Sequence, residues 1–152
     1  MDLIGNYAIS KLREKFWRSL RFTMKNDSFL VENDASERAI AHKLAEYLQK
    51  EFPEWHVDCE YNRNMDQVKR RADRTGFIPD IIVHLRETQS NLIVIEVKKS
   101  NGEYNDEEQR LKEATLGIFG YKLGIYVIFN VLGDYYVPPV VKFFSEGKEL
   151  KQ

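Results

Sequence analysis

The chain has 152 residues, a length that suits one domain built around a single core. Hydrophobic residues make up 43% of it and charged residues 31%, a balance that is typical of globular proteins and excludes a disordered chain. The formal net charge of −1 favours neither nucleic acid nor a membrane as a partner. The charge is unevenly spread, because residues 11–25 carry six Lys or Arg and one Glu, so one face can still be basic.

Cysteine usage and hydropathy exclude two further classes of protein. Cys59 is the single cysteine, so neither a disulfide framework nor a cysteine zinc site can be built. The sequence contains no signal-peptide pattern and no apolar run of about 18 residues. We therefore expect a cytoplasmic protein with no membrane partner.

Two helices are expected in the first third of the chain. Residues 7–23 have a basic amphipathic pattern, and residues 34–52 form the clearest helix, with Asp34 as its N-cap and Pro53 beyond its end. Residues 26–33 are predicted to connect the two helices. This organisation predicts an N-terminal helical extension over residues 1–33 and the main domain over residues 34–152, within one compact unit.

The remainder of the chain alternates between strand and helix patterns. Strands are predicted over residues 55–61, 79–85, 91–98 and 124–131, a polar loop over 62–77, a helix over 105–122, and an extended segment over 134–144. The short gap between the second and third strands predicts a hairpin. This order predicts an α/β fold with a mixed sheet flanked by helices.

Charged residues stand at the end of a strand that is predicted to be buried. Residues 92–95 are apolar, and Glu96 and Lys98 follow on one face, because side chains alternate along a strand. A hairpin centred at Thr88 places Asp80 opposite Glu96, whereas a hairpin centred at Gln89 places it opposite Lys98. In both registers Asp80 shares the face of Glu96 and Lys98.

This grouping of charges predicts a metal site. Two carboxylates that meet across a ladder repel each other, most strongly where they are partly buried, so positive charge must compensate. Lys98 supplies one charge, and Mg²⁺, which is commonly held by one or two carboxylates, can supply the rest. A metal beside a lysine suits phosphodiester hydrolysis, with Asp80 and Glu96 holding the metal and Lys98 assisting the attacking water.

Glu37 is a further candidate at the start of the clearest helix. It lies at helical spacing on one stripe with Ile40, Leu44 and Leu48, so we expect it at the inward-facing end of an apolar face, able to support the metal. The alternative is a structural role, because Glu37 would stand at the capping-box position of a helix capped by Asp34.

These residues resemble a known family pattern. Pro79-Asp80 and Glu96-Val97-Lys98, separated by 15 residues and preceded by a helix that carries Glu37, resemble the PD-(D/E)XK nuclease superfamily over residues 34–131. The resemblance implies a restriction-endonuclease-like fold and an Mg²⁺-dependent nuclease, with Mn²⁺ as a possible substitute. It implies metal ligands at Asp80 and Glu96, a catalytic lysine at Lys98 and a role for Glu37. The helix after the E-x-K strand often adds a polar residue in this family, and Gln109 is the best match here.

A basic stretch before the Pro-Asp strand offers contacts to a polyanion. Arg70, Arg71 and Arg74 either belong to a solvated loop or contact nucleic-acid phosphates beside the site, and the sequence favours neither. The expected function is a metal-dependent endonuclease that favours DNA over RNA and acts as a homodimer, since one site cuts one strand. The alternatives are a resolvase of four-way junctions and a degenerate module that only binds nucleic acid or protein.

Overall fold

The chain is described here from a computed structural model, which places residues 4–61, 63–64, 67–68, 78–117 and 119–152. The helices are α1 (Ile9–Asn26), α2 (Ser28–Glu32), α3 (Glu37–Glu51), α4 (Glu107–Ala114) and the short 3₁₀ helix η1 (Leu132–Asp134). The strands are β1 (His56–Cys59), β2 (Arg63–Asn64), β3 (Gln67–Val68), β4 (Ile81–His84), β5 (Asn91–Lys99), β6 (Leu123–Phe129), β7 (Val140–Ser145) and β8 (Lys148–Leu150).

A six-stranded mixed sheet organises the molecule. Its strand order is β1-β4-β5-β6-β7-β8, and β2 pairs with β3 in a separate short ribbon. Only the β5–β6 pair of the larger sheet is parallel, and α4 lies on the crossover between these two strands. The predicted α/β class, with a mixed sheet flanked by helices, is confirmed.

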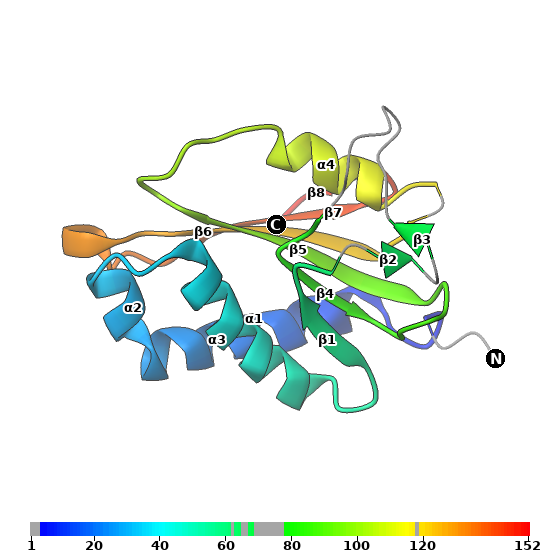
Figure 1. The fold of residues 1–152 in the computed structure, drawn as a ribbon, viewed down its shortest axis with the longest axis horizontal. Coiled ribbons are helices and arrows are strands. Elements are labelled where there is room, and N and C mark those ends of the chain that lie inside the picture. The colour runs from blue at the N-terminus through cyan, green and yellow to red at the C-terminus, as the bar shows by residue number, and fades with distance from the viewer. Residues whose placement is uncertain (1–3, 62, 65–66, 69–77, 118) are drawn as a thin grey trace.

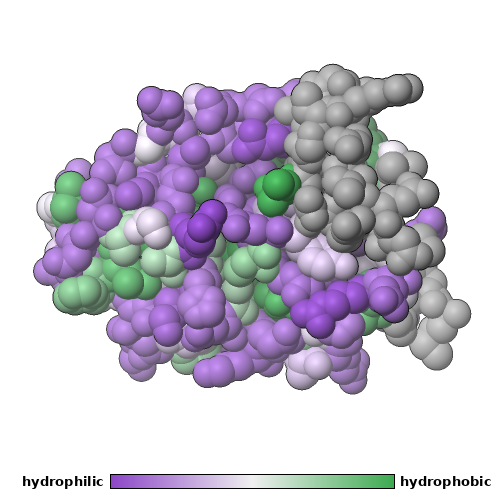
Figure 2. Space-filling view, viewed as in Figure 1, coloured by the Kyte–Doolittle hydropathy of each residue, from purple (hydrophilic) through white to green (hydrophobic). Residues whose placement is uncertain are grey.

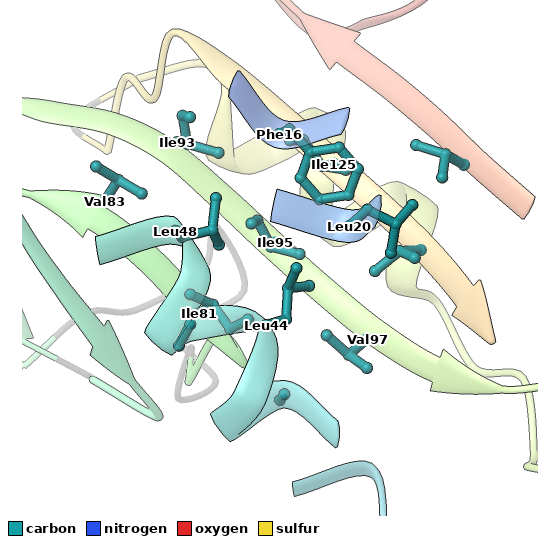
Figure 3. Close-up of a cluster of buried hydrophobic side chains, with 14 of the residues drawn as sticks. Phe16, Leu20, Leu44, Leu48, Ile81, Val83, Ile93, Ile95, Val97 and Ile125 are labelled. Atoms are coloured by element: carbon teal, nitrogen blue, oxygen red, sulfur yellow. The ribbon is translucent and has the colours of Figure 1, made fainter. Parts of the chain in front are cut away.

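Helices cover the two faces of the sheet unequally. Figure 1 shows α1, α2 and α3 on one face and α4 on the other. The larger core lies under α1 and α3 (Figure 3), where Phe16 and Leu20 of α1 meet Leu44 of α3 above the inward-facing residues of β4, β5 and β6. The smaller core lies under α4, where Leu111 packs with Ile82 and Val94.

Strand alternation explains why β5 is buried on both faces. Ile93, Ile95 and Val97 belong to the larger core, whereas Val94 belongs to the smaller one. Helices on both faces of the sheet require a nearly continuous apolar strand, and residues 91–97 are buried without interruption. The charged residues of the strand begin at Glu96, which is still buried, and continue with Lys98 and Lys99 at the half-buried end of the strand.

Several elements differ from their predicted extent: the extended segment over 134–144 is a strand only from Val140, and the part of the 62–77 loop that the structure describes includes β2 and β3. The helix predicted over residues 105–122 is confined to α4, because Thr115 is its C-cap, and Gly117 and Gly120 adopt positive φ angles of 64° and 51° that end helical geometry. The predicted connector over 26–33 contains a short helix, α2. The tail forms a β7–β8 hairpin, whose turn residues Glu146 and Gly147 both have positive φ, as a type I′ turn requires.

The face seen in Figure 2 is mostly hydrophilic, with apolar residues in small separate patches. Among the described residues, none of the helices combines the length and the apolar character that crossing a membrane would require.

Leu44 should be a sensitive position of the larger core, because it is fully buried between α3 and the sheet. We expect Leu44→Ala to lower the free energy of unfolding by about 2–5 kcal/mol, through lost burial and the cavity left behind. Urea denaturation measures this change. Phe29→Ala is the control, because Phe29 is 70% exposed and its loss should cost under about 0.5 kcal/mol. Equal losses in the two variants would contradict the assignment of the core.

Candidate functional site

The β4–β5 hairpin brings Asp80, Glu96 and Lys98 to one face of the sheet. Ile81 pairs with Ile95, so the register is the one centred at Thr88, and Asp80 comes opposite Glu96. Ile82 and Val94 face α4, and strand alternation places Asp80, Glu96 and Lys98 on the same side. The prediction that these three residues share a face is confirmed.

The carboxyl groups of Asp80 and Glu96 lie close enough for their charges to interact. Asp80 is held in place by the backbone of β5, because Val97 N donates to its Oδ2 at 2.7 Å. Burial, followed by the charge of Asp80, raises the pKa of Glu96 to about 8, and burial also raises the pKa of Asp80. Glu96 therefore retains its proton near neutral pH in the absence of a cation.

Lys98 points to a carboxylate that sequence reasoning missed. Its Nζ lies 2.8 Å from Oε1 of Glu107, the first residue of α4, and Glu107 is only 3% exposed. Burial opposes the charge of Lys98, but this ion pair raises the pKa of the lysine. The backbone N–H of Asn105 donates to Glu107 Oε2 at 2.7 Å, so Glu107 itself has a fixed position. Lys98 is thus kept charged and oriented beside the two acidic residues.

Arg110 of α4 supplies the positive charge next to Glu96. Its Nε donates to Glu96 Oε1 at 3.2 Å, and its Nη1 donates to Asp106 Oδ1 at 2.6 Å. The site therefore holds two ion pairs between α4 and β5. Arg110 of the helix pairs with Glu96 of the strand, and Glu107 of the helix pairs with Lys98 of the strand. Glu107 and Arg110 both reach the sheet because residues three apart lie on the same face of a helix.

Glu37 lies at the same end of β5, where its side chain accepts a hydrogen bond from the backbone of the strand. Its Oε2 accepts a hydrogen bond from Lys99 N at 2.9 Å, and its charge contributes to raising the pKa of Asp80. A Cβ on Gly102 would lie 3.1 Å from Glu37 Oε2, so the glycine permits this close approach. Glu37 therefore approaches the carboxyl pair from the α3 side.

The predicted cap of the α3 helix is wrong. Ser36 is the N-cap, its hydroxyl accepting from Ala39 N at 3.1 Å, so Glu37 is the first helical residue and does not occupy a capping-box position. Asp34 has a positive φ of 55° and instead binds Lys99 Nζ at 2.9 Å. Asp34 ties the end of β5 to the segment before α3.

The accessory candidates stand apart from this cluster. The Gln109 side chain lies 3.5 Å from Glu113 Oε1 on the exposed side of α4, so it does not join the carboxyl pair; the neighbouring Arg110 does. Arg70, Arg71 and Arg74 lie outside the described residues.

The sequence contains a signal for the two missed residues. Glu107, Arg110, Leu111 and Ala114 stand at i, i+3, i+4 and i+7, the pattern of one inward-facing helix stripe. Glu107, Leu111 and Ala114 are the buried residues of α4. Extending the apolar stripe towards the N-terminus of the helix predicts that Glu107 and Arg110 point towards the sheet.

A cavity of about 670 Å³ adjoins the site, between α4 and strands β6 and β7. Glu107 lines this cavity and also pairs with Lys98, so the cavity lies directly beside the charged residues of the site. Tyr126, which pairs with Glu96 in the β5–β6 ladder, lines it too.

The carboxylates of the site can be compared with the ligands that a divalent cation requires. Within the part of the chain that the structure describes, no group of three or more His, Cys, Asp or Glu is placed to hold a metal. Mg²⁺ does not require such a group, since one or two carboxylates, water and substrate phosphate commonly complete its shell. Asp80 and Glu96, two carboxyls that lie opposite each other, fit this hard-oxygen chemistry, and the charge of Glu37 also acts on Asp80.

Comparison of the chain with protein-family models, with curated proteins and with solved structures gives no match.

The raised pKa of Glu96 predicts a pH-dependent stability in the metal-free protein. A carboxyl whose pKa rises from 4.5 to about 8 on folding binds its proton more tightly in the folded state, so stability falls as the pH rises through this window. Glu96→Gln resembles the neutral acid and should remove the fall. We expect the wild type to lose on the order of 2–4 kcal/mol relative to this variant between pH 5 and pH 8.5.

Urea unfolding in EDTA across this pH range measures the difference. Glu103→Gln is the matched control, because Glu103 is exposed and should leave the pH profile of the wild type unchanged. Parallel profiles for the wild type and Glu96→Gln would show that Glu96 is ionised normally in the folded protein.

Proposed function

We propose that the chain is a metal-dependent nuclease of the restriction-endonuclease-like fold that uses Mg²⁺, or Mn²⁺ in its place. The observation that carries the proposal is the Asp80–Glu96 carboxyl pair at the end of a buried strand, with Lys98 on the same face. Burying two adjacent carboxyls is costly unless a cation offsets their repulsion. Ionisable groups with strongly shifted pKa values are concentrated at functional sites. The cluster therefore favours a catalytic role over a purely structural one.

The residues divide the work of phosphodiester hydrolysis between them. Asp80 and Glu96 would hold the cation, and Glu37, whose charge acts on Asp80, would support its water shell. The bound cation would lower the pKa of a coordinated water and neutralise charge on the phosphate. Lys98, charged and fixed by Glu107 at 2.8 Å, would donate a hydrogen bond to the attacking oxygen or to the phosphate, where negative charge develops.

DNA is the proposed substrate in preference to RNA, and a homodimer would place one site on each strand of a duplex. A resolvase of four-way junctions is the alternative within the same chemistry. The cavity beside the site is lined by two lysines and by the acidic residues Asp106, Glu107 and Glu108, so a phosphate backbone would be drawn to this side by the bound cation and not by the lining.

A different candidate function is a non-catalytic module that binds nucleic acid or protein. One observation favours it: Arg110 and Glu107 already neutralise Glu96 and Lys98 from within the chain. A closed network of ion pairs can be purely structural. This candidate predicts that a divalent cation neither binds nor stabilises the folded protein.

Cleavage assays test the proposal directly. Supercoiled plasmid, linear duplex, single-stranded DNA, a four-way junction and RNA would each be incubated with Mg²⁺, Mn²⁺ or EDTA. We expect metal-dependent cutting that falls at least about 100-fold in Asp80→Asn and in Lys98→Met, because each removes a group that stabilises developing charge.

Glu103→Gln is the control variant, since it removes an exposed carboxylate outside the cluster and should cut like the wild type. Preference for the junction over the linear duplex would identify the resolvase alternative. Cutting that persists in Asp80→Asn and Lys98→Met would assign the activity to another site or to a contaminant. The absence of both cutting and metal binding in folded protein would favour the non-catalytic module.

A further inference from the structure

The guanidinium of Arg110 is bound to Oε1 of Glu96, one of the two carboxylate oxygens that a metal could use. Its Nε lies 3.2 Å from Glu96 Oε1, and the Glu96 side chain is only 5% exposed, so little room is left for water on that side. Asp80 approaches the same carboxyl from the neighbouring strand. A cation that binds both carboxyls therefore meets a positive charge already in place.

The side chain of Arg110 is partly exposed and has a second partner, so it can move away from Glu96. Its side chain is 25% exposed, and its Nη1 is anchored 2.6 Å from Asp106, one helical turn earlier. Asp106 itself is 47% exposed and lines the cavity beside the site. The guanidinium can therefore let go of Glu96 and remain tethered at the rim of this cavity.

We infer that Arg110 is a counter-ion that alternates between two partners. In the metal-free protein it neutralises Glu96; when a divalent cation takes over Glu96, Arg110 is repelled and turns to a phosphate of the nucleic-acid substrate. The inference rests on the proposed function, and it assigns a phosphate-binding residue that the sequence pattern did not single out. A guanidinium suits both partners, because its planar fork matches carboxylate and phosphate oxygens alike.

The pair between Lys98 and Glu107 behaves differently. Glu107 is not one of the carboxyls proposed to hold the cation, and its position is fixed by the backbone N–H of Asn105. Metal binding therefore leaves this second pair intact. Arg110 alone of the two α4 side chains changes partner.

Metal affinity in the absence of substrate tests the first half of the inference. Mn²⁺ binding would be measured by electron paramagnetic resonance for the wild type, Arg110→Gln and Lys112→Gln. Removing the competing charge should tighten Mn²⁺ binding in Arg110→Gln by about tenfold. Lys112→Gln removes one positive charge from the same helix without touching Glu96 and should stay within about twofold of the wild type, because solvent screens this partly exposed charge.

Nucleic-acid binding tests the second half. Fluorescent oligonucleotides, single-stranded and duplex, would be titrated with Lys98→Met and with Lys98→Met/Arg110→Gln in saturating Mn²⁺, a background that is expected not to cut. The double variant should bind about tenfold more weakly. The slope of log affinity against log salt should also fall by about 0.7–0.9, the loss of one phosphate contact.

The outcomes separate this inference from the proposed function. Equal or weaker Mn²⁺ binding by Arg110→Gln, with saturable binding in the wild type that Asp80→Asn abolishes, would overturn the inference alone. Tighter Mn²⁺ binding with an unchanged salt slope would overturn the transfer to phosphate. Absence of saturable Mn²⁺ binding in both the wild type and Arg110→Gln would contradict the proposed function and the inference together.

Discussion

The repulsion between the buried carboxyl of Glu96 and the half-buried carboxyl of Asp80 is the constraint around which this end of the molecule is arranged. The hairpin register places them opposite each other, and burial prevents water from screening them. Three features of the chain offset the cost: the raised pKa of Glu96, a backbone hydrogen bond from Val97 to Asp80, and the guanidinium of Arg110. Each of these three devices is one that a cation could replace.

The topology explains why these charges meet here. Helices on both faces of the sheet force β5 to be apolar until its last residues, so its polar side chains collect at the strand end. The crossover to the parallel strand β6 carries α4 over the same point, and the first turn of α4 delivers Glu107 and then Arg110. From the opposite side, α3 begins at Glu37, which binds the backbone of Lys99.

Sequence reasoning reached the strand-borne part of the site because strand geometry is simple. Alternation determines that Glu96 and Lys98 share a face, and the length of the hairpin loop leaves two registers, both of which place Asp80 there. Helix rotation was harder to predict, because α4 is mostly charged and an error of one residue exchanges Gln109 for Arg110. The cap of α3 was missed because Asp34 and Ser36 are both good N-cap residues, and only tertiary contact with Lys99 assigns Asp34 elsewhere.

Diffraction from crystals grown in saturating Mn²⁺ would test the central claim most directly, since Mn²⁺ can be located by its anomalous signal. The account predicts a peak bonded to oxygens of both Asp80 and Glu96, with Arg110 no longer on Glu96. A site that keeps the Arg110–Glu96 pair and shows no anomalous peak at either carboxyl would contradict it.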